Sequence, residues 1–523
     1  MGWFSWLYYM LLFFFISSSV SSSSIPLSSA PSPFPSFPSC HIDDSKALLQ
    51  FKNSFSIDYT LANDYCGPDV RSPTISWESG TDCCGWSGVT CNDITDLLHL
   101  DIDDANFARD IPLELSYLSK LQTLEVCGGN QQLRLNTSTF ERIVTNLTNL
   151  QILAFDFVDM SRDNPASLMN FSSSLNILQL CSLRELSLSY TNFSIDVLDL
   201  TRNLKSLDGL YLSNCSGQRT TTLPKIDSYN STQISLSPHS SKNKSLGPVH
   251  WNFEYLLLDD NLLNGTIPNW LFALPSLKHL RLRNNKFTGH IPEFLTTSLI
   301  ELSLGDNKLN GSIPISIFQL VNLTSLDLSS NSLSGFPQID LSLNTLSSHN
   351  SISSKHSTNH SIFPNLECLR LSHTKIEGNI PEWIFKVGRD SLTYLNLSHN
   401  FLTHIDRFPW KNLQYLDLHS NILHGHLPIP PPSIKVFSIS HNQLIGEVPS
   451  LICNLSSLEV LDLANNSLSG KLPPCIGNLS DNLSVLALRM NKFHGTIPTK
   501  LFAKKNMLRN LNLNGNEFEG SLP

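Results

Sequence analysis

Residues 458–474 read LEVLDLANNSLSGKLPP, and the pattern also appears in IKVFSISHNQLIGEVP at 434–449 and LSVLALRMNKFHGTIP at 483–498. All three fit L-x-x-L-x-L-x-x-N-x-L-x-G-x-I-P, with Ile, Val or Phe replacing Leu at some positions. They begin about 24 residues apart, a spacing typical of stacked repeats. One such unit cannot bury its apolar side alone, so the pattern predicts a solenoid whose successive coils cover one another.

The alternating leucines in each repeat predict a short strand. Leu458, Leu461 and Leu463 should point inward, and strands of successive coils should stack as a parallel sheet. An asparagine follows each strand, and its amide can both donate and accept hydrogen bonds. We therefore expect a column that satisfies buried backbone groups where the coils turn, formed by Asn442, Asn466 and Asn491.

Composition limits the function classes. A chain of 523 residues would ordinarily divide into several domains, but a repeat array grows without dividing. The net charge of -9 gives no basic field for nucleic acid. The sequence lacks G-x-S-x-G, H-E-x-x-H and a Gly-rich phosphate loop. We therefore expect no enzyme activity, no cofactor and no metal.

The N-terminus carries a targeting signal. Residues 1–16 are almost wholly apolar and are followed by a run of serines. This predicts a signal peptide at 1–24, because the run is shorter than the about 20 residues of a membrane span. A membrane anchor is the alternative. Residues 25–39 form a Ser/Pro-rich leader without core-forming side chains.

Residues 40–92 are expected to cap the first coil, since a solenoid end exposes apolar surface. The segment DDSKALLQFKNSF predicts a helix capped by Asp43 or Asp44. Its apolar stripe consists of Ala47, Leu48, Phe51 and Phe55. Trp77 and Trp86 are large enough to cover the coil.

Cysteines should hold this cap together. Cys84 and Cys91 can close a short loop, and Cys83 has two candidate partners in Cys40 and Cys66. A zinc site of Cys83, Cys84, Cys91 and His99 has the wrong spacing and the wrong compartment. The chain has 11 cysteines, an odd number, so at least one thiol is free or pairs with another chain.

The remaining residues divide by the regularity of their repeats. Irregular repeats occupy 93–217, and regular ones occupy 251–337 and 364–523, where the chain ends inside a coil without a cap. That ending suggests a fragment of a longer receptor or a truncated product. Residues 218–250 are an insertion or a decayed repeat. Residues 338–363 are an island or a decayed repeat, and a decayed coil is favoured because the gap is near two periods.

The G-x-I-P tails, the ALLQFK stretch and the CCGWSGVTC stretch resemble plant leucine-rich-repeat receptor-like proteins. The resemblance implies an α/β repeat fold, a curved right-handed solenoid with a parallel concave sheet, and a second short strand in each coil. Members of this family lack a kinase of their own. They bind an extracellular peptide, protein or glycan and signal through a partner receptor kinase, often in defence.

Residues between the strand leucines should face the concave side and contact a ligand. The candidates are His279, Arg281, Arg283, Tyr394, His399, Tyr415, His419, His441 and Arg489. Tyr and Arg are favoured types at binding hot spots. His399, His419 and His441 should form a loose column, and we hypothesise that their protonation tunes ligand affinity in a mildly acidic compartment.

Two covalent modifications are expected outside the cap. About sixteen N-x-S/T sequons occur, and the glycosylation candidates include Asn136, Asn230, Asn322, Asn396 and Asn482. Cys453 and Cys475 lie about one period apart, so either a disulfide joins neighbouring coils or both thiols stay free and buried.

These features favour an extracellular receptor-like protein in the secretory pathway. A full-length form would sit at the plasma membrane with a co-receptor kinase, and a truncated form would be in the apoplast. The alternatives are a secreted inhibitor of a microbial cell-wall-degrading enzyme and a truncated soluble decoy. The inhibitors that share the G-x-I-P coil are shorter and end in a cysteine cap, which favours the receptor.

Overall fold

The computed structural model describes residues 40–54, 76–91, 98–102, 110–127, 133–160, 182–191, 206–215, 252–333, 362–405, 407–479, 482–502 and 507–521. The expected signal peptide and leader lie outside these ranges. Inside them, no helix combines the length and the apolar character needed to cross a bilayer.

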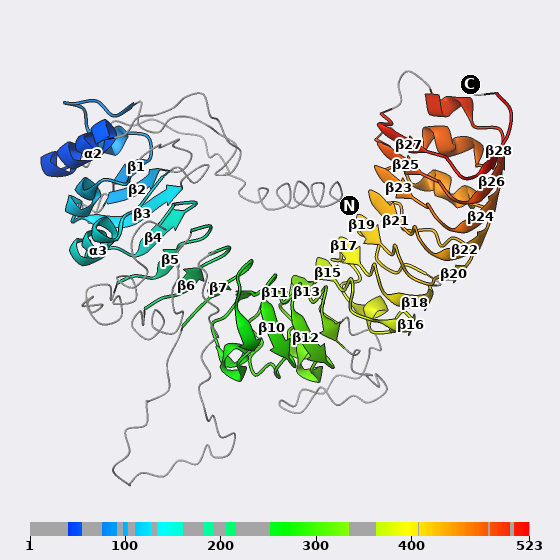
Figure 1. The fold of residues 1–523 in the computed structure, drawn as a ribbon, viewed down its shortest axis with the longest axis horizontal. Coiled ribbons are helices and arrows are strands. Elements are labelled where there is room, and N and C mark those ends of the chain that lie inside the picture. The colour runs from blue at the N-terminus through cyan, green and yellow to red at the C-terminus, as the bar shows by residue number, and fades with distance from the viewer. Residues whose placement is uncertain are drawn as a thin grey trace, which may run out of the picture. The chain divides into compact units, whose positions relative to one another are not determined.

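One strand from each coil joins a 17-stranded sheet (Figure 1). Consecutive strands pair in parallel, except that β1 and β2 are antiparallel. The strands are β1 (Val89–Cys91), β2 (Leu98–Ile102), β3 (Leu121–Cys127), β4 (Ile152–Asp156), β5 (Glu185–Ser187), β6 (Gly209–Tyr211), β7 (Tyr255–Leu257), β9 (His279–Arg281), β11 (Glu301–Ser303), β13 (Ser325–Asp327), β15 (Cys368–Arg370), β17 (Tyr394–Asn396), β19 (Tyr415–Asp417), β21 (Val436–Ser438), β23 (Val460–Asp462), β25 (Val485–Ala487) and β27 (Asn510–Asn512).

Many coils carry a second short strand after the turn, as the family resemblance implied. These strands are β8 (Asn264–Thr266), β10 (Lys286–Gly289), β12 (Lys308–Gly311), β14 (Ser332–Leu333), β16 (Glu377–Asn379), β18 (Phe401–His404), β20 (His424–Gly425), β22 (Gln443–Gly446), β24 (Ser467–Gly470), β26 (Lys492–Gly495) and β28 (Glu517–Phe518). They pair in parallel within three separate sheets, which contain β8 to β14, β16 with β18, and β20 to β28.

Short helices complete the coils, and two longer helices lie near the N-terminal end. The helices are α2 (Ile42–Ser54), η2 (Cys83–Gly85), η3 (Leu113–Tyr117), α3 (Thr137–Asn146), η6 (Asn269–Ala273), η7 (Ile315–Gln319), η8 (Ile384–Lys386), η9 (Ser450–Asn454), η10 (Pro474–Asn478) and η11 (Thr499–Phe502). Several of the short helices begin directly after the repeat proline, whose fixed φ suits the position before a helix.

The strand leucines form the core, as the alternation predicted. Leu458, Leu461 and Leu463 are each 0% exposed. Such residues run without interruption through one cluster from the cap to the last coils. Burying apolar surface stabilises the fold by roughly 25 cal/mol per Å². The solenoid therefore rests on contacts between neighbouring coils.

The asparagine column binds each coil to the one before it, and this prediction is also confirmed. The Asn466 side chain donates to the carbonyls of Leu463 in its own coil (3.2 Å) and of Ile439 in the preceding coil (3.1 Å). Its Oδ1 accepts from the Leu444 N–H at 3.1 Å. The same bonds recur at Asn285, Asn307, Asn331, Asn421, Asn442 and Asn491.

Two segments without repeats, 218–250 and 338–361, lie outside the described residues. The strands that flank each segment are nevertheless hydrogen-bonded neighbours, since β6 pairs with β7 and β13 pairs with β15 in register. No strand of the long sheet separates them. The interpretation of 338–363 as an island or a decayed repeat, with a decayed coil favoured, stays a prediction.

The cap helix starts earlier than expected. α2 begins at Ile42, and the His41 carbonyl accepts the first helical hydrogen bond from Ser45 at 3.0 Å. Asp43 donates its N–H to His41 Nδ1 at 3.4 Å. The prediction that Asp43 or Asp44 caps the helix is therefore wrong. Both carboxylates lie in the first turn, where the helix dipole favours negative charge.

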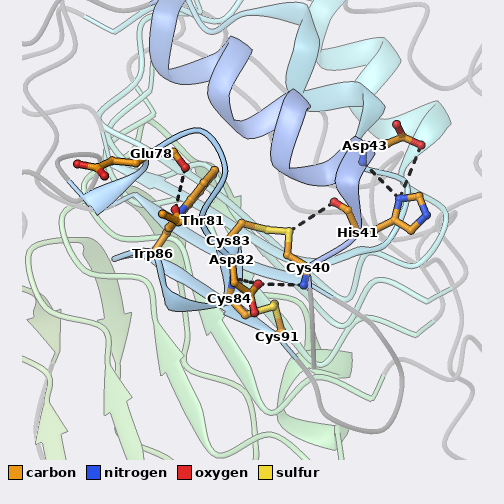
Figure 2. Close-up of a disulfide and its surroundings, with 10 residues drawn as sticks. All are labelled: Cys40, His41, Asp43, Glu78, Thr81, Asp82, Cys83, Cys84, Trp86 and Cys91. Carbon is orange, nitrogen blue, oxygen red and sulfur yellow. Dashed lines mark hydrogen bonds and ion pairs between the residues drawn. A yellow bond between two sulfur atoms is a disulfide. The ribbon is translucent and has the colours of Figure 1, made fainter. Parts of the chain in front are cut away.

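Figure 2 shows how the cap is held together. Cys83 is bonded to Cys40, one of its two candidate partners. Cys84 is bonded to Cys91, as predicted. The Asp82 carboxylate accepts from the backbone N–H groups of Cys40 (2.9 Å) and Cys84 (3.1 Å). All three cysteines of the rejected zinc site are therefore in disulfides.

Two further features match expectation. Trp77 and Trp86 are 1% and 3% exposed, and their rings stack at 5.5 Å between centroids. A disulfide joins Cys453 of η9 to Cys475 of η10 on the next coil, so these thiols are not free. Among the described residues, Cys215 and Cys368 are free thiols.

Candidate functional site

The outward side chains of the long sheet form two registered rows, and we call this surface the sheet face. The first row contains Tyr255, His279, Glu301, Ser325, Cys368, Tyr394, Tyr415, Val436, Val460 and Val485. The second row contains Leu257, Arg281, Ser303, Asp327, Arg370, Asn396, Asp417, Ser438, Asp462 and Ala487. The residue between the two rows is a leucine, or Phe437 in β21, and points into the core, so the repeat itself fixes these positions.

Glu301 of β11 contacts two of the predicted site residues, and both of these lie on β9. It accepts from Arg281 Nε at 2.7 Å and lies 3.1 Å from His279 Nδ1. Burial disfavours the charged form of Glu301, but its bonds to His279 and Arg281 outweigh this and lower its pKa. The Tyr255 ring stacks on His279 at 4.8 Å.

Arg283 lies two residues after Arg281 in the same coil and is also paired. Its guanidinium contacts Asp306 at 2.7 Å and Asp327 at 3.0 Å. Asp259 accepts from the Arg283 N–H at 2.9 Å, and burial raises its pKa to about 7 against the opposing charge of Arg281. Arg281 and Arg283, which were predicted to contact a ligand, are therefore paired with carboxylates of the same face.

A stack of planar groups follows on the next strands. The Arg370 guanidinium of β15 lies 4.6 Å from the centroid of the Tyr394 ring. Tyr394 and Tyr415, registered partners on β17 and β19, stack at 4.1 Å with 7° between their planes. Cation–π and aromatic stacking energies hold these side chains in one geometry.

Histidines lie at the turns that follow these strands. His399 stacks on His373 at 4.0 Å and meets His419 edge-on at 4.2 Å. His441 contacts Asn465 at 2.8 Å. The predicted column is therefore incomplete, because His419 occurs one residue earlier in its turn than His399 and His441 do. The described residues contain no group of three or more His, Cys, Asp or Glu side chains arranged to hold a metal.

The three clustered histidines titrate differently. Burial, followed by the charge of His419 and His373, lowers the pKa of His399 to about 4. Burial also lowers the pKa of His373. Burial opposes charge on His419, but its hydrogen bond to Asp417 raises the pKa. His399 thus stays neutral in mild acid, and the hypothesis of pH-tuned affinity now rests on His419.

We predict that His399→Gln makes the fold less sensitive to acid. The lowered pKa means that the unfolded chain binds more protons below pH 6.5, so His399 reduces stability as pH falls from 6.5 toward 4. His419 acts in the opposite sense, because its raised pKa gives stability below pH 6.5 that is lost as pH rises through the folded value. Thermal unfolding from pH 4 to 7 measures how the stability of the fold depends on pH. Equal acid sensitivity in wild type and His399→Gln would contradict the first assignment.

The site was only partly predictable. Arg489 is exposed at the end of β25 and is separated from Tyr415 by β21 and β23. Sequence analysis missed Arg370, His373 and Tyr255. The outward register of the L-x-L strands identifies Arg370 and Tyr255. His373 precedes Thr374 in the asparagine column as His399 precedes Asn400, which is the signal that could have found it.

Sequence families agree with this geometry. A leucine rich repeat N-terminal domain matches residues 41–92. Leucine rich repeats match residues 276–297, 298–320, 322–359, 365–387, 391–411, 433–455 and 457–479. The described coils form a leucine-rich-repeat solenoid.

Individual relatives of this leucine-rich-repeat chain are plant receptors. Receptor-like protein 18 of Arabidopsis thaliana is 28% identical over 62% of this chain and 38% of its own length. Receptor-like protein Cf-9 of Solanum pimpinellifolium is 31% identical over 27% of this chain and 23% of its own length. The predicted resemblance to plant receptor-like proteins is confirmed. Because the chain spans well under half of these relatives, its ligand and partners are proposals.

Solved structures share the fold. The ectodomain of the Arabidopsis thaliana receptor kinase GASSHO1/SCHENGEN3, in complex with CASPARIAN STRIP INTEGRITY FACTOR 2, aligns with a TM-score of 0.52 and 26% identity. That alignment covers 91% of this chain and 59% of the other. A TDR receptor aligns with a TM-score of 0.57 and 23% identity over 80% and 68% of the two chains, which shows the fold alone.

Proposed function

We propose that this chain is the extracellular ligand-recognition part of a plant receptor-like protein and that its ligand is an extended peptide. The peptide lies across the sheet face from β7 to β19. The proposal is supported by the similarity to receptor-like proteins and by the GASSHO1/SCHENGEN3 ectodomain, whose structure contains a bound partner, CASPARIAN STRIP INTEGRITY FACTOR 2. Signalling through a partner receptor kinase at the plasma membrane, in defence, is part of the same proposal.

The observation that carries the proposal is the stack of Arg370, Tyr394 and Tyr415. Tyr394 and Tyr415 are registered partners, and Arg370 of the neighbouring β15 lies over the Tyr394 ring, so little side-chain freedom remains to be lost on binding. Tyr and Arg are also the residue types that dominate binding energies at protein surfaces. A preformed group of this kind suits an aromatic or aliphatic side chain of a peptide.

The ion pairs on β9 to β13 support a peptide rather than a highly charged polymer. Arg281 and Arg283 are paired with carboxylates of the same face, and His279 contacts Glu301. The surface therefore offers fixed donors and acceptors with little excess charge. Such groups match the alternating N–H and C=O groups of an extended backbone.

We predict that Tyr394→Ala and Tyr415→Ala each weaken binding about 30-fold, equivalent to about 2 kcal/mol. Each change removes one ring of the stack and leaves the core leucines in place. The ligand is first captured by the purified protein from a library of extended peptides, and its affinity is then measured by titration calorimetry.

Tyr117→Ala is the matched control, because Tyr117 is 56% exposed on η3 and does not belong to the sheet face. It should bind with wild-type affinity. Arg281→Ala is a poorer test, since it leaves Glu301 without its principal partner. Wild-type affinity in both tyrosine variants would place the binding site elsewhere.

A further inference from the structure

One glycosylation sequon lies on the sheet face. Asn396-Leu397-Ser398 begins in β17, and Asn396 stands in the second row between Arg370 and Asp417. Asn136 instead caps α3, and Asn322 and Asn482 are exposed outside the strands. Asn230 lies outside the described residues. Among sequons that the structure describes, only Asn396 is within a strand of the long sheet.

The Asn396 side chain is held by one of its two polar atoms. Its Oδ1 accepts from the Ser398 N–H at 2.9 Å and from the Ser398 hydroxyl at 2.8 Å. The acceptor atom for a glycan is the other one, Nδ2. Asn396 is half-buried in the outward row, so part of its side chain is accessible to solvent.

The fold does not require asparagine at this position. Asp327, Asp417 and Asp462 stand at the same register, and each accepts a hydrogen bond from the N–H two residues later at 3.0 Å. Aspartate therefore performs the same turn-holding role without creating a sequon. Ser398 is part of the repeat, since Ser329 makes the same two hydrogen bonds to Asp327, so the sequon arises from asparagine replacing aspartate at 396.

We propose that Asn396 carries an N-linked glycan and that this glycan closes the Tyr394–Tyr415 end of the sheet face to the ligand. This inference rests on the proposed function, which places the chain in the secretory pathway. A glycan is bulky and extends from its asparagine into solvent. Asn396 lies two residues after Tyr394 and beside Asp417, so its glycan and a ligand on the tyrosine stack occupy the same space. Glycan occupancy at one asparagine thus sets the fraction of molecules that bind.

The first test needs no ligand. The protein is produced in plant cells, and mass spectrometry of its peptides measures glycan occupancy at Asn396. Hydroxyl-radical labelling then compares Tyr394 and Tyr415 in wild type and in Asn396→Asp. We expect an occupied Asn396, and we expect both tyrosines to be labelled faster in the variant. An unoccupied Asn396, or equal labelling in the two proteins, would overturn the inference.

The second test uses the captured peptide. A molecule whose site is closed does not bind, so the number of peptides bound per chain should equal the fraction of wild-type molecules without the glycan. Asn396→Asp should raise that number to one. Asn322→Asp is the matched control and should change neither stoichiometry nor labelling. If neither wild type nor Asn396→Asp captures a peptide, the proposed function fails, whereas the labelling result still decides the glycan.

Discussion

Replacing Asn331 with leucine is expected to lower the free energy of unfolding of the surrounding coils by about 3–5 kcal/mol, because several buried backbone groups lose their partner. The Asn331 amide donates to the carbonyls of Leu304 (2.9 Å), Leu328 (3.2 Å) and Ser329 (3.1 Å). Its Oδ1 accepts from the Leu309 N–H at 3.0 Å. Asn331 is 6% exposed, so water cannot replace these bonds.

Asn331→Thr is the matched control, since threonine already occupies this column at Thr374. There the hydroxyl satisfies one carbonyl, that of Leu371, at 2.7 Å. We therefore expect a smaller loss for Asn331→Thr than for Asn331→Leu. Native-state hydrogen exchange of the β11 and β13 amides measures both losses locally, which suits an array of nearest-neighbour coils. Equal protection in wild type and Asn331→Leu would show that the column is not structural.

Trp410→Ala is the second change with a large expected effect. Trp410 stands three residues before Leu413, where other coils place a leucine such as Leu320 or Leu455. Its side chain is 0% exposed, and its Nε1–H donates to the Val387 carbonyl at 2.8 Å. The cavity left by truncation costs about 3–5 kcal/mol. The unpaired carbonyl adds to that loss.

Trp410→Phe separates the two contributions. Phenylalanine fills most of the volume and removes only the hydrogen bond to Val387, so we expect a loss of about 1–2 kcal/mol. Urea unfolding followed by far-ultraviolet circular dichroism compares the variants. A loss in Trp410→Ala no larger than that in Trp410→Phe would mean that packing at this position contributes little.

The repeat pattern was enough to predict the coil. Leucine spacing specifies which side chains are buried, and Asn466 and its equivalents specify the turn. This works along the array because each coil makes the same kinds of contact with its neighbours. The same register also predicted which residues face outward on the sheet. Tyr394 and Tyr415 were found in this way, and the structure brings their rings together.

Features that depend on side-chain contacts between neighbouring coils were not predictable. Arg281 and Arg283 were expected to face a ligand, but Glu301, Asp306 and Asp327 from neighbouring coils pair with them. Sequence spacing predicts in which row of the sheet face a side chain lies. It does not predict where the charged end of that side chain points. The cap helix likewise starts at Ile42 because His41 supplies its first bonds, a role that residue preferences do not assign to histidine.

The segments without a clear repeat could not be assigned for a related reason. Length alone cannot distinguish a decayed coil from extra residues between adjacent coils. Pairing between β13 and β15 joins the strands on either side of residues 338–361, since Leu328 donates to the Arg370 carbonyl at 3.0 Å and Cys368 donates to the Thr324 carbonyl at 3.0 Å. Strand β15 therefore stacks directly on the strand that precedes the segment in the chain.

Hydrogen exchange of the Leu328 and Cys368 amides is the most direct test of a single uninterrupted sheet face. If the coils on both sides of residues 338–361 form one registered sheet, these amides exchange as slowly as the Val460 amide, which donates to the Lys435 carbonyl at 2.9 Å inside a regular part of the array. Fast exchange at Leu328 and Cys368, with slow exchange at Val460, would show that the array divides there and that no ligand surface runs from β7 to β19.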